Sequence, residues 1–198
     1  MTTYRVGLLL FDDVEVLDFA GPYEVLSVTQ DEQQDKPFTV VTISQTGQEI
    51  KARNGLRVTP DYSFEDHPSL DILIVPGGYG AREVESKNPV LVDWVKQQNE
   101  SVEIMTSVCT GAFILAEAGL LKGKKVTTHW TTLDRLENEF PELTVIRGVK
   151  FIDEGHIITS AGISAGIEMA LHLVAELTTL ETARHTAKHM EYDWQTQY

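Results

Sequence analysis

Cys109 is the only cysteine of the chain, and its neighbours could give it a chemical role. The apolar residues 101–108 before it predict a short buried strand, and residues 111–118 after it predict a helix that stops at Gly119. Cys109 would therefore lie at a strand-to-helix elbow, where the free N–H groups of the first helical turn favour an anion. We expect a thiol there to be partly thiolate near neutral pH, and the thiolate is the nucleophile. The alternative is an inert cysteine in the core, the commoner role of a lone cysteine.

Two other segments are expected to end beside Cys109. The apolar run at residues 4–11 predicts a first parallel strand, and Asp18 follows it, in the loop or first turn before a helix whose start is marked by Gly21-Pro22. A second buried strand, at residues 71–75, runs into Pro76-Gly77-Gly78, where glycines indicate a positive φ or a close approach of other groups. Taken alone, Asp18 could be only a helix N-cap or a loop residue, which is the commoner role of an aspartate before a helix.

The remaining segments alternate between strand and helix patterns. Strands are predicted at 38–44, 125–128 and twice within 145–158, helices at 89–99, 133–140, 165–178 and 182–192, and a small antiparallel excursion at 47–62. This order predicts one α/β domain over residues 1–198, with a doubly wound, mostly parallel sheet covered by helices on both faces. Ligands of such sheets bind at the carboxyl ends of the strands. Asp18, Gly78 and Cys109 are all expected at that edge.

The net charge and the cysteine count of the chain limit its binding partners and its cellular location. With 30 acidic against 16 basic residues the net charge is −14, which disfavours binding to nucleic acid or to an anionic membrane. The single cysteine excludes an internal disulfide, so a cytoplasmic location is the simplest expectation. We expect neither a metal nor a cofactor. His185 and His189 have the spacing of a helical metal pair but lack the glutamate of a metalloprotease motif.

Five motifs together resemble the DJ-1/PfpI superfamily over nearly the whole chain. They lie at residues 17–22 (LDFAGP), 74–78 (IVPGG), 106–111 (TSVCTG), 125–130 (KVTTHW) and 158–167 (ITSAGISAGI). Within the superfamily they are most similar to the motifs of isocyanide hydratases. The resemblance implies a flavodoxin-like fold, a homodimer, an elbow cysteine with a strained backbone, and Asp18 facing its sulfur. Peptidase-like members carry a histidine directly after the cysteine, whereas this chain has Thr110, so no adjacent imidazole can activate the thiol.

The reaction implied is the addition of water to an isocyanide, giving an N-substituted formamide. Cys109 would attack the terminal carbon, a proton would be delivered to form a thioimidate, and water would then attack with Asp18 as the base. Thr110 would hold the water or Asp18, and the N–H groups of Gly78 and Thr110 would stabilise negative charge. Tyr79 and Trp130 are either pocket walls or core residues.

Three other functions stay open at this stage. A DJ-1-like glyoxalase or deglycase, or a redox-sensing cysteine, would use the same elbow, and Asp18 in place of glutamate disfavours the glyoxalase. A ligand-binding regulatory module is the third, because some transcription regulators resemble this domain at their N-terminus. His129 is interpreted as a structural hydrogen-bonding residue. The physiological substrate is left open.

Overall fold

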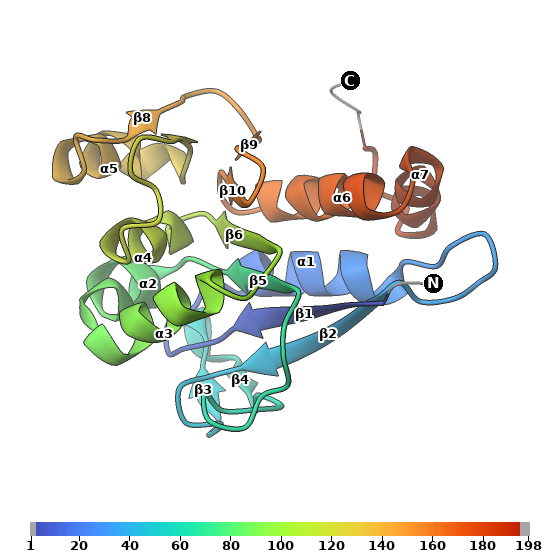
Figure 1. Ribbon diagram of the computed structural model, residues 1–198, viewed down its shortest axis with the longest axis horizontal. Helices are drawn as coiled ribbons and strands as arrows, with labels where there is room; N and C mark the ends of the chain where they lie inside the picture. Colours follow the sequence, from blue (N-terminus) through green and yellow to red (C-terminus); the bar gives the residue numbers. More distant parts are fainter. Residues whose placement is uncertain (1–2, 195–198) are drawn as a thin grey trace.

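A six-stranded sheet forms the centre of the protein, with the strand order β2-β1-β5-β6-β10-β9 (Figure 1). The computed structural model describes residues 3–194, so the outermost residues of the predicted 1–198 domain lie outside it. The strands are β1 (Tyr4–Leu9), β2 (Phe38–Ile43), β5 (Ile72–Val75), β6 (Ile104–Val108), β9 (Phe151–Asp153) and β10 (Ile157–Ser160). All neighbours pair in parallel except β9 and β10, which pair antiparallel, as the sequence pattern of a mostly parallel sheet predicts.

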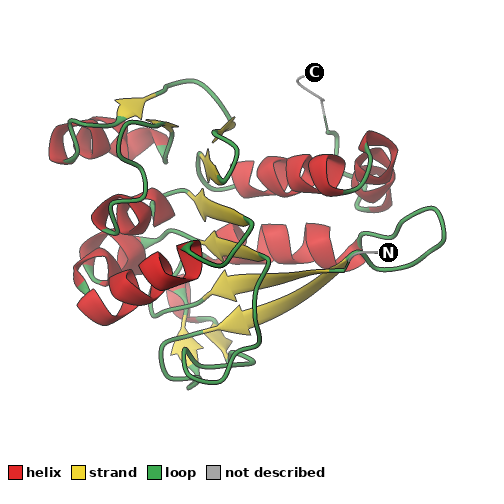
Figure 2. Ribbon diagram, viewed as in Figure 1, coloured by secondary structure: helices red, strands yellow, loops and turns green. Residues whose placement is uncertain are grey.

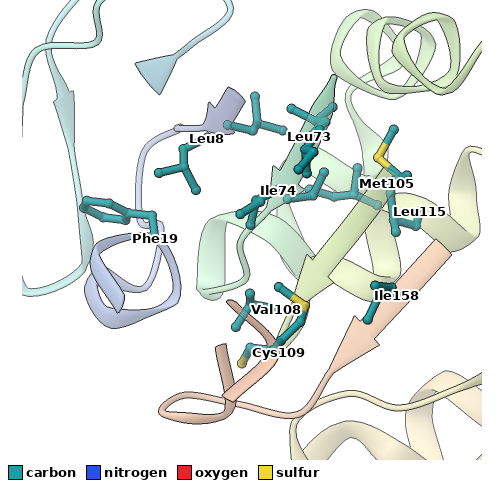
Figure 3. Packing of buried hydrophobic residues seen from close by; sticks show 14 of the residues in the cluster. Leu8, Phe19, Leu73, Ile74, Met105, Val108, Cys109, Leu115 and Ile158 are labelled. Carbon is teal, nitrogen blue, oxygen red and sulfur yellow. The ribbon is translucent and has the colours of Figure 1, made fainter. Parts of the chain in front are cut away.

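The central strands are apolar on both faces because helices cover both sides of the sheet. All four residues of β5 are buried, and so are the last four of β1. In the register, Leu8 lies beside Ile74 and Leu73 beside Met105, so the side chains of three neighbouring strands meet in one core (Figure 3). The carboxyl ends of β1, β5 and β6 are thereby held at one edge.

Helices flank this sheet in two groups (Figure 2). α1 (Val16–Val28) packs against α6 (Ala165–Leu177), which packs against α7 (Leu180–His189). The second group consists of α2 (Tyr79–Glu83), α3 (Pro89–Asn99) and α4 (Gly111–Glu117), with α4 lying against β5 and β6. α5 (Leu133–Glu139) follows outside these groups. Short 3₁₀ turns occur at Arg53–Gly55, Glu85–Lys87 and Trp130–Thr132. None of the helices described is long and apolar enough to cross a membrane.

Two small sheets lie beside the main one. β3 (Ile50–Lys51) and β4 (Arg57–Val58) form the predicted antiparallel excursion, and Asn54 between them has a φ of 64°. β7 (Lys125–Val126) pairs in parallel with β8 (Thr144–Val145) and is not a strand of the main sheet. The predicted strand at 125–128 is thus too long. It ends early because Thr127 N–H donates to the side chain of Thr159 at 2.9 Å instead of to a strand backbone.

The start of the first helix also differs from the sequence prediction. α1 begins at Val16 instead of at Gly21-Pro22, so Asp18 lies in its first turn and Pro22 lies inside it. The helix accepts the proline at the cost of one backbone hydrogen bond. Gly21 has a packing role instead, because a Cβ there would lie 2.9 Å from Ile167 of α6. The close approach of α1 and α6 therefore explains a glycine that the sequence alone suggested as a helix start.

Candidate active site

The backbone at Cys109 is strained and is fixed from several sides. Its φ is 55°, in the left-handed region that non-glycine residues rarely adopt. Its N–H donates to the Ser160 carbonyl at 3.1 Å, and its own carbonyl accepts from the Thr128 hydroxyl at 2.7 Å. The residue is 5% exposed at the end of β6, next to Val108 (Figure 3). Such strain persists only where the surroundings impose it, and it is common at functional sites.

Asp18 is fully buried and is held by the glycine pair that follows β5. The Gly77 N–H donates to Asp18 Oδ2 at 3.0 Å. The other oxygen, Oδ1, has no hydrogen-bond partner of ordinary geometry in the described chain, although the Cys109 thiol is close enough to influence the carboxyl. A Cβ on Gly77 would lie 2.4 Å from Thr110 N and 2.9 Å from Asp18 Oδ2. Only glycine therefore allows the three segments to approach this closely.

Burial changes the acidity of both reactive groups. It raises the pKa of Asp18 to about 7, with a further increase from the Glu15 charge, against the opposing hydrogen bonds from Gly77 and Cys109. Burial also raises the pKa of the Cys109 thiol, and the neighbouring Asp18 charge raises it further. The expectation of a thiolate at neutral pH is therefore wrong for this site. The amides of the short α4 helix do not compensate for the loss of water and the adjacent carboxylate, so the sulfur keeps its proton and Asp18 is the group that titrates near neutrality.

Thr110 links the elbow to the loop after β5. Its hydroxyl donates to the Gly78 carbonyl at 3.0 Å and accepts from the Gly78 N–H at 2.9 Å. The Gly78 N–H, proposed above as a donor to the reacting substrate, is therefore engaged within the protein. The Thr110 N–H instead interacts with the Cys109 sulfur and opposes the rise in the thiol pKa. Thr110 is 1% exposed, so its first role is to hold the two loops together.

A pocket of about 390 Å³ opens onto the sulfur. Its lining consists of Glu15, Arg53, Gly78, Arg82, Cys109, Thr110, His129, Thr131 and Ile163. Cys109, Thr110 and Gly78 are thus brought together, with Asp18 buried behind Cys109. Tyr79 and Trp130 are not among the lining residues, and their side chains are 49% and 76% exposed. They are surface residues here, neither walls of this pocket nor part of the core.

Sequence reasoning missed most of the pocket wall. Glu15, Arg53 and Arg82 come from three separate loops or helix ends, and no motif joins them. His129, interpreted as structural, also lines the pocket. Its Nδ1 lies 2.7 Å from the Thr131 hydroxyl and accepts from the Thr131 N–H at 3.3 Å. Burial lowers the pKa of His129, and the Arg82 charge lowers it further, so the imidazole is neutral at pH 7. Among the described residues no cluster of three or more His, Cys, Asp or Glu side chains could hold a metal ion.

Comparisons with known proteins identify the family of the chain. A family model described as the DJ-1/PfpI family matches residues 4–176. The isonitrile hydratase of Pseudomonas putida is 38% identical over 165 residues, which cover 81% of this chain and 66% of that protein. The HTH-type transcriptional regulator GbdR of Pseudomonas aeruginosa is 30% identical over 157 residues, covering 79% of this chain and 42% of the regulator. The chain thus spans just under two thirds of the first relative and less than half of the second.

Solved structures share the fold over nearly the full chain. The crystal structure of a ThiJ/PfpI family protein from Pseudomonas syringae has a TM-score of 0.86 and 26% identity, covering 100% of this chain and 78% of that one. Drosophila melanogaster DJ-1beta has a TM-score of 0.83 at 21% identity, covering 98% of this chain and 100% of that one. The second match carries information on the fold alone.

Proposed function

The chain belongs to the DJ-1/PfpI family, and from that premise we propose that it is an isocyanide hydratase, an enzyme that adds water to an isocyanide and releases an N-substituted formamide. The observation that carries this proposal is the Asp18–Cys109 pair at the base of a small pocket. An isocyanide needs a soft nucleophile for its terminal carbon and one group that both takes and returns protons. Asp18, with a pKa raised to about 7, suits that double task.

The proposed reaction uses one proton carrier throughout. Ionised Asp18 takes the thiol proton of Cys109 while the sulfur forms a bond to the terminal carbon, and that carbon then receives the proton from Asp18, giving a thioimidate. Water adds to the thioimidate carbon. Asp18 takes one proton from this water and passes it to the nitrogen. The carbon–sulfur bond then breaks, the formamide leaves, and the remaining hydroxyl proton returns through Asp18 to the sulfur.

Two further features support this reaction over peptide cleavage. Thr110 occupies the position after the nucleophile, so the thiol has no adjacent imidazole there, and Asp18 is the nearest base. The Pseudomonas putida relative named isonitrile hydratase is also 38% identical. A glyoxalase acting on reactive carbonyls is the second candidate, and it is favoured by one observation, the neutral His129 on the wall of the same pocket.

A direct assay separates the two candidates. Purified protein is mixed with an alkyl isocyanide, and the formamide is followed by liquid chromatography; methylglyoxal is tested in parallel for conversion to lactate. We expect formamide production and little lactate. Efficient lactate production without isocyanide consumption would replace the hydratase with the glyoxalase, and oxidation of Cys109 without either turnover would favour a redox sensor.

We also propose a homodimer, as the family resemblance implies, and a cytoplasmic location, the simplest one for a chain with a single cysteine. Leu17 and Tyr23 on α1 are both 40% exposed, and a second copy packed on this helix would cover apolar side chains such as these. Light scattering at micromolar concentration is expected to give twice the 22.1 kDa chain mass. A mass of one chain would contradict the dimer.

A further inference from the structure

The wall of the Cys109 pocket is unusually charged for an enzyme of small apolar substrates. Three ionic side chains line it: Glu15, Arg53 and Arg82. Arg53 and Glu15 form an ion pair with an Nε–Oε2 distance of 3.6 Å. This pair leaves the Arg82 guanidinium as the uncompensated charge of the wall, since the His129 imidazole is neutral.

The partner of Arg82 outside the pocket is shared with other cations. Arg82 Nε lies 3.5 Å from Glu83 Oε1, a loose contact. The same carboxylate accepts a hydrogen bond from Arg135 and lies 3.9 Å from Lys87 Nζ. The Arg135 hydrogen bond holds the pKa of Glu83 below its usual range, and the charges of Lys87 and Arg82 act in the same direction. Glu83 is therefore shared among Arg82, Lys87 and Arg135, and it compensates the charge of Arg82 only in part.

The guanidinium of Arg82 is also oriented by its surroundings. Its central carbon lies 5.7 Å from the centroid of the Tyr79 ring, within the range of a cation–π contact. The Arg82 side chain is 25% exposed, so it is partly shielded from water. An arginine that is partly immobilised and weakly paired loses little conformational entropy and no strong ion pair when it binds a carboxylate. Its planar guanidinium can donate hydrogen bonds to both carboxylate oxygens at once. Tyr79, which does not line the pocket, would thus act through Arg82.

We propose that the substrate carries a carboxylate on its substituent and that Arg82 binds this carboxylate while the isocyanide carbon meets Cys109. This inference rests on the proposed function and deepens it, since it names the substrate class as isocyano carboxylic acids. The single net positive charge of the wall matches a monoanion better than a phosphate ester. Arg82 is a substrate-binding residue in this scheme, with no part in proton transfer.

Two isocyanides of almost equal size test the proposal. Isocyanoacetate carries the carboxylate, and methyl isocyanoacetate masks it as a neutral ester. We expect the wild type to prefer the acid by about tenfold or more in kcat/KM, as a charged hydrogen bond predicts. In Arg82→Met, kcat/KM for the acid is expected to fall by about tenfold, chiefly through a higher KM. For the ester, kcat/KM should change by less than about threefold.

Matched variants complete this experiment. Arg82→Lys keeps the charge without the fork and should restore part of the preference. Arg147→Met is the control, because Arg147 pairs with Asp134 and Glu137 on the surface and does not line the pocket. It should leave both substrates unchanged within about twofold. A wild type that prefers the ester, or an Arg82→Met variant that loses equally on both substrates, would overturn the proposal. Retained ester turnover shows that Arg82→Met folds.

A binding measurement separates this proposal from the hydratase itself. Calorimetry of Cys109→Ser with N-formylglycine, the product expected from isocyanoacetate, is compared with the same titration of its methyl ester. We expect binding of the acid only, lost when Arg82→Met is added. If the wild type turns over no isocyanide but this Arg82-dependent binding persists, the hydratase proposal fails while the carboxylate site stands. If N-formylglycine binds equally with and without Arg82, or does not bind, the site is refuted.

Discussion

Two pockets of similar volume lie at opposite ends of the parallel strands. The pocket at Cys109, of about 390 Å³, faces the carboxyl ends, and another of about 360 Å³ lies beside Tyr4 at the start of β1 and Leu177 at the end of α6. Each has an aspartate nearby with one oxygen lacking a hydrogen-bond partner, Asp18 and Asp31 respectively. Volume and an unpaired oxygen therefore do not distinguish them.

The two pockets differ in the hydrogen bonds and the burial of their aspartates. Asp31 accepts hydrogen bonds from the N–H groups of Gln33 and Asp35 and so shapes its own partly exposed loop. Asp18 is buried beside the Cys109 thiol, and burial raises its pKa to about 7. Ligand sites of such sheets form at the carboxyl ends of the parallel strands, where several loops converge. Backbone N–H groups of these loops are free to hold a buried polar side chain, as Gly77 holds Asp18.

The largest expected effect is the loss of the nucleophile. Cys109→Ala should lower kcat for an isocyanide by at least about 1,000-fold, because no other group forms the covalent intermediate. Glu32 lines the other pocket, and the matched variant Glu32→Gln should change kcat by less than about twofold. Steady-state assays measure both, with circular dichroism to confirm the fold. Appreciable loss with Glu32→Gln would end the distinction between the two pockets.

The next effect concerns proton transfer by Asp18. Asp18→Asn should lower kcat about 100-fold or more, because the amide cannot exchange a proton between acid and base roles. In the wild type kcat/KM should fall as pH decreases through about 7, where Asp18 becomes protonated and can no longer accept the thiol proton. A pH–rate profile checks this limb. If Asp18→Asn showed the same fall of kcat/KM at low pH, the titrating group would be a residue other than Asp18.

The same variant should alter stability in a pH-dependent way. Because the folded protein raises the Asp18 pKa from 3.8 to about 7, it holds this proton more tightly than the unfolded chain does, and stability falls as pH rises through that window. The amide that replaces the carboxyl in this variant cannot ionise. The free energy of unfolding of Asp18→Asn should therefore exceed that of the wild type by up to about 4 kcal/mol at pH 8, with the gap closing toward pH 4. Urea titrations at both pH values measure it, and a gap independent of pH would contradict the buried carboxylate.

The smallest expected effect compares two glycines. Gly77→Ala should destabilise the fold by about 1–3 kcal/mol and reduce turnover, because its Cβ would clash with the Thr110 backbone. Gly148 has a φ of 75° but open space around it, so Gly148→Ala should cost about 1 kcal/mol from backbone strain and leave turnover intact. Thermal unfolding and isocyanide turnover are measured for both. Equal turnover in the two variants would show that the Gly77 approach does not position the site.

Local sequence patterns predict most strands of the main sheet and the position of Cys109 at the end of one of them. Apolar runs such as residues 4–11 and 71–75 indicate buried parallel strands because periodicity and length are local properties, and Cys109 at the end of such a run follows from order alone. The positive φ of Gly78 was predictable for the same reason.

The electrostatics of the site and the residues of the pocket wall depend on contacts between distant segments. The protonated thiol and the raised pKa of Asp18 depend on burial and on charges from other segments, which no local pattern encodes. Two distant segments must also come together for the Gly78 N–H to donate to Thr110, 32 residues away. Arg82 and Cys109 line one pocket for the same reason, and the exposure of Trp130 likewise follows from the fold. Residue types identify the reactive groups, but desolvation and contact between distant loops set what those groups can do.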